Sequence, residues 1–334
     1  MFPCDIRIQI TSECNQYCSH CFASSNDGTM TEELSDTEFL NIIDQITRQE
    51  LDAICITGGE PLVRSGLVFK ILERLQNHSA IKTINTNGWF LTRQLAMRLE
   101  EAGLDTVQIS LDSSIKEKHD SFRGLSGSHD RALEAIKHSV KAGLETHVRV
   151  TITPFNFDEM PAILDLALSK GAHRLVVKPL VPSGRASLSC EPVSPEQHKK
   201  AVMDLISLTG RNREETRDYV QFLAPCLPFL VDREYVKYSE SCECGDGLAF
   251  ITSSGDVQPC GYAHLVLGNL LETSLEHIWS SSAIIRRWRN GRLNGKCLTC
   301  EFGEICRGGC RAIAYETTGN LTSPDPTCWQ EDLG

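Results

Sequence analysis

Residues 10–22 read Ile-Thr-Ser-Glu-Cys-Asn-Gln-Tyr-Cys-Ser-His-Cys-Phe, and this stretch decides how the rest of the chain is interpreted. It continues a run of alternating apolar residues at 6–10, which predicts a strand. Its thiols Cys14, Cys18 and Cys21 fall within one short loop. Three such thiolates can hold three corners of an iron–sulfur cluster and leave the fourth iron open to another ligand. A structural zinc site is the alternative, but such sites are normally closed by four protein ligands.

The composition is that of an ordinary globular protein. The 334 residues are 41% hydrophobic and 23% charged. No apolar run reaches the length of a membrane span and no secretion signal is present, so we expect a cytoplasmic protein with no membrane partner. In a reducing compartment, fifteen cysteines are more often metal ligands than disulfide partners. The net charge of −11 argues against a nucleic-acid partner.

Strands and helices alternate through the first half of the chain. We expect strands at 6–10, 53–57, 81–86, 107–111, 147–152 and 175–178, each followed by a helical pattern. The first helix begins at a capping box formed by Ser35 and Glu38. Six strand–helix repeats over about 180 residues predict an α/β fold with a parallel sheet, since crossover helices permit parallel neighbours. Functional residues in such sheets gather at the carboxyl ends of the strands.

The unusual clusters of the first half all follow predicted strands: Cys14 to Cys21, Gly58-Gly59-Glu60-Pro61, Thr86-Asn87-Gly88, Ser110 to Asp112 and Pro179 to Arg185. With these clusters, roughly the first 185 residues resemble the radical S-adenosylmethionine (SAM) superfamily. The resemblance implies a partial (β/α)6 barrel whose cluster binds SAM through its open iron. It also implies that Gly58, Gly59, Glu60 and Pro61 form the GGEP motif that contacts the SAM amino group. Thr86, Asn87, Ser110 and Asp112 lie where the family binds the SAM carboxylate and ribose.

Five further residues complete the predicted site. His20 stands where the family usually has a large aromatic residue against the adenine, and it either stacks on a purine or faces solvent. Arg123 either neutralises a carboxylate of SAM or substrate or is an ordinary surface arginine. Arg149, inside the fifth strand, needs an anionic partner if it faces the barrel interior. Gly184-Arg185 resembles a segment common in the family, and we expect it to line the substrate cavity.

The composition changes toward the C-terminus. Residues 183–225 lack strand alternation, and eight of the fifteen cysteines lie between residues 242 and 328. The tail resembles the SPASM extension, which binds auxiliary iron–sulfur clusters, through Cys244, Gly255, Cys260, Cys297, Cys300, Cys306, Cys310 and Cys328. Zinc ribbons are the alternative for C-x-x-C pairs. We therefore divide the chain into a radical SAM barrel at 1–185, a helical bridge at 186–238 and a SPASM domain at 239–334.

Two fully ligated auxiliary clusters need eight cysteines, and the strict motif supplies seven. The resemblance implies one cluster on Cys244, Cys260 and Cys310 and a second on Cys297, Cys300, Cys306 and Cys328. We choose Cys242 as the missing ligand. Cys226 competes with it, and a site left open for substrate is a third alternative. Cys4 and Cys190 remain without a role.

The resemblance implies an oxidoreductase. Reduction of the first cluster would cleave SAM to a 5′-deoxyadenosyl radical that takes hydrogen from an unactivated carbon, and the auxiliary clusters would accept the remaining electron. We expect a ribosomally made peptide, receiving a thioether or carbon–carbon link, as the substrate. A small-molecule haem precursor is the runner-up, and a non-catalytic electron carrier is the alternative from another class. The expected partners are an electron donor such as flavodoxin or ferredoxin and a separate peptide-recognition protein, because only thirteen residues precede Cys14.

Overall fold

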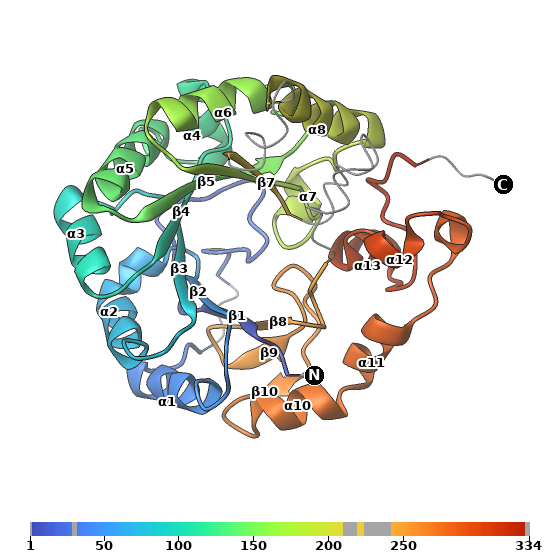
Figure 1. The fold of residues 1–334 in the computed structure, drawn as a ribbon, viewed down its shortest axis with the longest axis horizontal. Helices are drawn as coiled ribbons and strands as arrows, with labels where there is room; N and C mark the ends of the chain where they lie inside the picture. Colours follow the sequence, from blue (N-terminus) through green and yellow to red (C-terminus); the bar gives the residue numbers. More distant parts are fainter. Residues whose placement is uncertain (1, 29–31, 210–218, 224–241, 331–334) are drawn as a thin grey trace.

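The computed structural model describes residues 2–28, 32–209, 219–223 and 242–330. Its first half is a curved parallel sheet with helices covering the outer face (Figure 1). The six strands are β1 (Asp5–Gln9), β2 (Ala53–Thr57), β3 (Ile81–Thr86), β4 (Thr106–Ser110), β5 (Glu145–Ile152) and β6 (Arg174–Pro179). The helices between them are α1 (Asp36–Ile46), α2 (Ser65–Arg74), α3 (Arg93–Glu101), α4 (Lys116–Arg123), α5 (Ser128–Ala142) and α6 (Met160–Ser169). The predicted partial barrel of six strand–helix repeats is confirmed.

Local sequence signals explain where these helices begin and end. At α1 the Ser35 hydroxyl accepts from the Glu38 amide at 3.3 Å, and the Glu38 carboxylate accepts from the Ser35 amide at 2.8 Å. This is the predicted capping box, which satisfies amide groups that have no partner within the helix. Helix α5 ends at Gly143, whose φ of +89° lies in the left-handed region that glycine adopts without strain.

The sheet extends beyond the six repeats in both directions. It has ten strands in the order β10-β9-β8-β1-β2-β3-β4-β5-β6-β7. The added strands are β7 (Val220–Phe222), β8 (Leu248–Ile251), β9 (Asp256–Gln258) and β10 (Gly268–Asn269). The predicted helical bridge at 186–238 also contains a strand, because β7 pairs in parallel with β6 although 183–225 lacks strand alternation. Three residues are too few to show the alternation on which the prediction depended.

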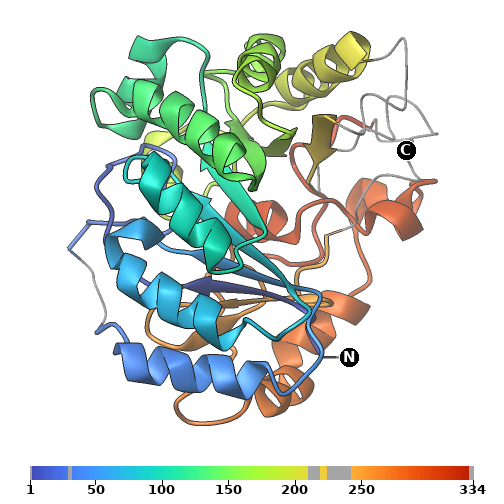
Figure 2. The same cartoon turned by 60° about the vertical axis from the view of Figure 1, so that its left-hand side comes forward.

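The C-terminal third joins the barrel through strand pairing. Strand β8 runs parallel to β1 with Asp5 opposite Leu248 and Ile8 opposite Ile251. The turn at Gly255, with φ of +85°, then forms a hairpin between β8 and β9. The sheet therefore crosses the boundaries that we drew at 185 and 239, as the side view in Figure 2 shows. Part of the predicted bridge, including Cys226, lies outside the described residues.

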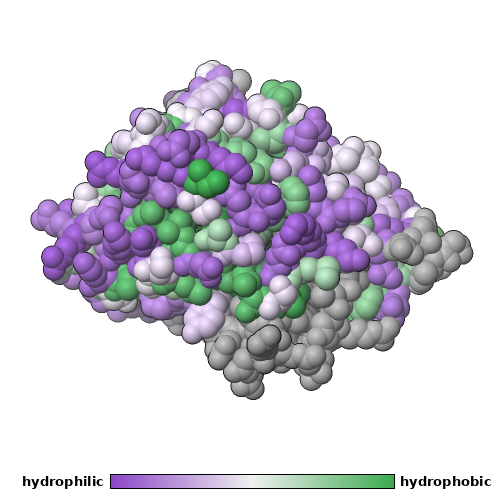
Figure 3. All heavy atoms as spheres, turned by 90° about the horizontal axis from the view of Figure 1, so that it is seen from above, coloured by the Kyte–Doolittle hydropathy of each residue, from purple (hydrophilic) through white to green (hydrophobic). Residues whose placement is uncertain are grey.

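The remaining helices are η1 (Pro61–Arg64), which follows β2, and, beyond β6, α7 (Ala186–Ser189), α8 (Pro195–Thr209), α10 (Leu275–Ser281), α11 (Ala283–Asn290), η4 (Gly295–Leu298), α12 (Gly303–Cys306) and α13 (Arg311–Thr318). The main apolar core lies between the sheet and its outer helices, with fully buried side chains such as Ile8, Phe39 and Ile54. Polar residues predominate on the face seen in Figure 3, with smaller hydrophobic groups between them. None of the described helices is long and apolar enough to cross a membrane.

Candidate active site

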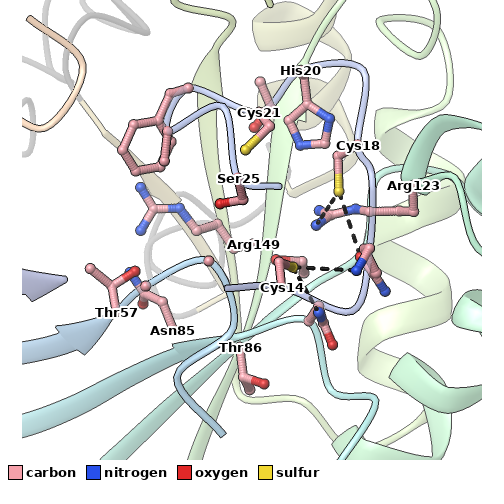
Figure 4. A pocket seen from close by; sticks show the side chains of 18 of the residues that line it. Cys14, Cys18, His20, Cys21, Ser25, Thr57, Asn85, Thr86, Arg123 and Arg149 are labelled. Carbon is pink, nitrogen blue, oxygen red and sulfur yellow. Dashed lines mark hydrogen bonds between the residues drawn. The ribbon is translucent and has the colours of Figure 1, made fainter. Parts of the chain in front are cut away.

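The predicted cysteine loop opens onto a cavity at the carboxyl ends of the parallel strands. Cys14, Cys18 and Cys21 all line this cavity, which we call the SAM-site cavity (Figure 4). Arg123 Nη1 lies 3.9 Å from Cys18 Sγ, and Asn87 Nδ2 lies 3.8 Å from Cys14 Sγ. Burial raises the pKa of Cys14 to about 12 and that of Cys18 to about 11. These groups are thus neutral thiols unless a metal centre supplies positive charge.

Several unpaired polar atoms point to a polar occupant of the SAM-site cavity. Buried atoms of Gln16, His20, Ser25 and Asn85 have no hydrogen-bond partner in the described structure, and all four residues line the cavity wall. Leaving such atoms unsatisfied costs stability, so native proteins normally pair them. The thiols and these polar atoms together fit an iron–sulfur cluster with a polar ligand beside it.

No three His, Cys, Asp or Glu side chains among the described residues are placed to hold a metal ion together. Cysteines that ligate a four-iron cluster bind different irons and need not meet at one point. None of the fourteen described cysteines forms a disulfide. The donor set is therefore a group of free thiols arranged around a cavity.

The glycines of the GGEP segment allow it to lie directly against the cysteine loop. Gly58 and Gly59 line the SAM-site cavity. The Gly59 amide donates to the Thr11 carbonyl at 2.7 Å, and the Glu60 amide donates to the Glu13 carbonyl at 2.8 Å. A Cβ atom at Gly59 would lie only 2.3 Å from the Glu13 carbonyl oxygen. Only glycine permits this close approach of two backbones.

Glu60 has a different position from the one we expected. Its carboxylate accepts from the Leu62 amide at 3.0 Å, the Thr86 hydroxyl at 2.8 Å and the Asn87 amide at 2.7 Å. It is fully buried, and neither Glu60 nor Pro61 is among the cavity-lining residues. Burial raises the Glu60 pKa to about 7. The carboxylate has no free face for an ammonium group because it joins the GGEP loop to the Thr86–Asn87 loop.

His20 lies inside the site. Its ring lines the SAM-site cavity and stacks on Phe122 with centroids 4.3 Å apart. Its side chain is only 12% exposed, so the solvent-facing alternative is wrong. Burial lowers the His20 pKa to about 3, which leaves the imidazole neutral near pH 7.

Arg123 is also buried, and the surface alternative for it is wrong. Its Nε donates to Asp112 Oδ2 at 2.8 Å, and its Nη2 donates to the same oxygen. Burial opposes ionisation of Asp112, but the Arg123 cation outweighs it and holds the Asp112 pKa at about 2. Arg123 lies on the cavity wall and Asp112 behind it. Thr86, Asn87 and Ser110 line the wall as expected from their positions after the strands.

The Gly184–Arg185 segment does not line the cavity, contrary to expectation. Arg185 Nη1 donates to the Cys18 carbonyl at 2.9 Å, and the Arg185 amide donates to the Cys21 carbonyl at 2.9 Å. Its guanidinium also pairs with Asp27 and lies 3.5 Å from the centre of the Tyr17 ring. All these contacts are with residues 17–27, so Arg185 holds the cysteine loop from behind.

A second cavity adjoins the first. It is lined by four cysteines, Cys242, Cys244, Cys260 and Cys310, and we call it the four-thiol cavity. The two cavities have seven wall residues in common: Phe22, Thr57, Asn85, Arg149, Lys178, Val181 and Tyr262. A separate small cavity is lined by the other four tail cysteines, Cys297, Cys300, Cys306 and Cys328. The structure thus sorts the eight cysteines between 242 and 328 into two groups of four.

Sequence reasoning missed several wall residues. Thr57 of β2, Asn85 of β3 and Lys178 of β6 project onto the inner face of the barrel, and Tyr262 follows Cys260. The available signal was a polar residue within an otherwise apolar strand. We used that signal only for Arg149, which does face the interior (Figure 4).

Comparisons with known proteins agree with this geometry. Residues 8–167 match the radical SAM superfamily, and residues 242–301 match the SPASM iron–sulfur cluster-binding domain. The chain is 30% identical to an AdoMet-dependent heme synthase of Methanosarcina barkeri, with 96% of this chain and 94% of that protein covered. It is 31% identical to the mycofactocin maturase MftC of Mycobacterium tuberculosis, with 98% and 83% covered.

Solved structures show the same fold. Streptococcus suis SuiB bound to the precursor peptide SuiA superimposes with a TM-score of 0.78 at 18% identity, covering 98% of this chain and 76% of that one. The anSMEcpe structure with bound AdoMet gives a TM-score of 0.79 at 18% identity, covering 98% and 90%. The radical SAM match implies a [4Fe–4S] cluster and SAM, and the SPASM match implies further iron–sulfur clusters. The chain belongs to the radical SAM superfamily and is an enzyme of that family with a C-terminal SPASM domain.

Proposed function

We propose that this enzyme oxidises an unactivated C–H group of a substrate that binds between the SAM-site cavity and the four-thiol cavity. The observation that carries this proposal is the common wall of seven residues. A substrate there would contact the SAM site on one side and the cysteines of the four-thiol cavity on the other. When bound, SAM and its cluster supply the 5′-deoxyadenosyl radical, and the auxiliary clusters accept the electron that the substrate loses.

The residues of the SAM-site cavity have distinct roles in this proposal. Cys14, Cys18 and Cys21 hold the first cluster. The backbone at Gly58 and Gly59 takes the SAM amino group, since the Glu60 side chain is already occupied. The neutral His20 ring, fixed against Phe122, offers a flat face to the adenine.

A second set of residues completes the SAM site. Thr86, Asn87 and Ser110 supply hydroxyl and amide groups at the wall for the SAM carboxylate and ribose. Arg123 stands beside Cys18, with Asp112 fixing its orientation. Pro61 is the first residue of η1, and its restricted backbone orients the GGEP loop.

We further propose two auxiliary clusters. The four-thiol cavity supplies Cys242, Cys244, Cys260 and Cys310 for one. The small cavity lined by Cys297, Cys300, Cys306 and Cys328 supplies the other. The place of Cys242 in the first set supports it as the eighth ligand. In this arrangement the cysteines that would hold the first auxiliary cluster lie beside the proposed substrate position. An electron donor such as flavodoxin or ferredoxin would reduce the cluster at the SAM site.

The substrate that we place first is a haem precursor with an oxidisable side chain. The similarity to a heme synthase over nearly the full length of both proteins supports it. A peptide, which we placed first from the sequence, becomes the second candidate. The similarity to a maturase at 31% identity supports it.

The function is tested by counting iron and by product analysis. Anaerobically reconstituted protein should hold about 12 irons, falling to about 8 when Cys14, Cys18 and Cys21 are all replaced by alanine. Formation of 5′-deoxyadenosine from SAM should rise with iron-coproporphyrin and not with a short Cys-containing peptide encoded beside the gene. The reverse result would establish the peptide candidate. Reduced protein that forms no 5′-deoxyadenosine with any substrate or cell extract would leave only an electron carrier.

A further inference from the structure

Two basic side chains on the common wall have no carboxylate partner within the part of the chain that the structure describes. Arg149 of β5 and Lys178 of β6 line both cavities. Lys178 lies opposite Thr151, which is two residues beyond Arg149 on the neighbouring strand. Alternate residues of a strand point to the same face, so both basic side chains project to the inside of the barrel. Among the described residues, their side-chain contacts are with neutral groups.

Those neutral contacts fix the positions of the two cations. Arg149 Nη1 donates to Gln108 Oε1 at 3.0 Å, and its Nη2 lies 3.4 Å from the Tyr262 hydroxyl. Lys178 Nζ lies 3.5 Å from the centre of the Tyr262 ring. Burial lowers the pKa of Lys178, and the positive charge of Arg149 lowers it further. Two fixed like charges at a cavity wall are unfavourable until an anion binds between them.

We propose that Arg149 and Lys178 together hold a carboxylate of the substrate, so that the common cavity takes a carboxylate-rich small molecule of the tetrapyrrole kind. The guanidinium fork can bind both oxygens of one carboxylate, and the ammonium can contact it as a point charge. Arg7, a third basic residue on the wall of the four-thiol cavity, is already paired with Asp5 at 3.4 Å. This inference rests on the proposed function, because it concerns the substrate of the same site.

Two other anions would lie near the same cations if SAM and the auxiliary cluster were bound. The carboxylate of SAM would occupy the SAM-site cavity, and a cluster held by thiolates would add negative charge near Cys260. If either were the partner, removing a cation would change SAM binding or the properties of the auxiliary iron and leave substrate binding unaltered. The experiment must therefore measure binding of SAM and of the substrate separately.

The test measures binding of iron-coproporphyrin and of its tetramethyl ester to the reconstituted holoprotein by porphyrin absorbance. The variants are Arg149→Gln, Arg149→Lys and Lys178→Gln. Arg48→Gln removes the same charge from an exposed position after α1 and serves as the matched control. Iron content confirms that each variant retains its clusters. SAM affinity and 5′-deoxyadenosine formation are recorded on the same samples.

We expect the wild type to bind the free acid at least tenfold more tightly than the ester. Arg149→Gln and Lys178→Gln should each weaken binding of the acid about tenfold or more, and Arg149→Lys should recover part of the loss. SAM affinity and the Arg48→Gln control should be unchanged.

Equal binding of acid and ester, no binding of the acid, or full binding by both glutamine variants would overturn the inference. A loss of SAM affinity alone would assign the cations to the cofactor and overturn it as well. If acid binding depends on both cations but never stimulates SAM cleavage, the anion site stands and the proposed function fails. If turnover proceeds without any effect of either variant, the function stands and the anion site fails.

Discussion

Replacing Gly59 by alanine tests whether the contact between the GGEP loop and the cysteine loop creates the SAM site. The added Cβ would lie 2.3 Å from the Glu13 carbonyl oxygen and 2.7 Å from its carbon, far inside normal contact. Both atoms belong to the backbone, so no side-chain rotation can relieve the overlap. The two loops must move apart by roughly 1 Å to restore ordinary packing distances.

The loss of stability follows from the hydrogen bonds that this movement breaks. Two backbone hydrogen bonds join the loops, at 2.7 Å from the Gly59 amide and at 2.8 Å from the Glu60 amide. Each contributes about 1 kcal/mol, and overpacking adds about 1–3 kcal/mol. We therefore expect Gly59→Ala to lose about 3–5 kcal/mol of stability and to lower the Tm by about 4–7 °C.

Gly66→Ala is the matched control. Gly66 lies exposed in α2, and an added Cβ would meet no atom within 4 Å. Alanine there should gain about 0.5–1 kcal/mol, because it favours the helix more than glycine does. The assays are thermal unfolding of the reconstituted protein, iron content and SAM affinity. A Gly59→Ala protein with the Tm, iron content and SAM affinity of the wild type would refute the argument.

Three further predictions concern the groups that support the site. Arg185→Ala removes the donor that holds the Cys18 carbonyl. A chelator should therefore extract iron from the SAM site several-fold faster than from the wild type, while the auxiliary iron is released at the wild-type rate. Burial raises the Glu60 pKa from 4.5 to about 7, so the wild type loses stability as pH rises from about 4.5 to about 7. Glu60→Gln should therefore gain about 1 kcal/mol per pH unit relative to wild type across that interval and no more above it. A Tm difference constant with pH would contradict this. Asp112→Asn leaves the buried Arg123 cation unpaired and should cost about 3–5 kcal/mol, and an unchanged Tm would refute that pairing role.

The sequence was sufficient to predict the repeating part of the fold. Each of the six inner strands is an apolar run followed by a helix with its own start or stop signal, so local periodicity and chain order determine the barrel. Strands β7 and β8 were not predictable in the same way. They have three and four residues, and their partners β6 and β1 are distant in sequence.

The positions of the cysteine thiols and of the glycine backbone were predictable from sequence motifs. The hydrogen-bond partners of polar side chains were not. The loop with Cys14 and the glycine pair have the expected location. The Glu60 carboxylate is held by hydrogen bonds from Thr86 and Asn87, and no local sequence pattern reveals these contacts. Arg185 likewise contacts a loop more than 150 positions earlier in the chain.

The pairing of β8 with β1 has a consequence for biosynthesis. Strand β1, which leads directly into the cysteine loop, is hydrogen-bonded to β2 on one side and to β8 on the other. While the ribosome is still making the middle of the chain, β1 is an edge strand with one row of backbone groups unpaired. That row is covered only after residues 248–251 emerge, roughly three quarters of the way through synthesis. Insertion of the first cluster into its final surroundings must therefore wait for the last third of the protein, and a chain truncated before β8 would expose an aggregation-prone edge beside the thiols of the cysteine loop.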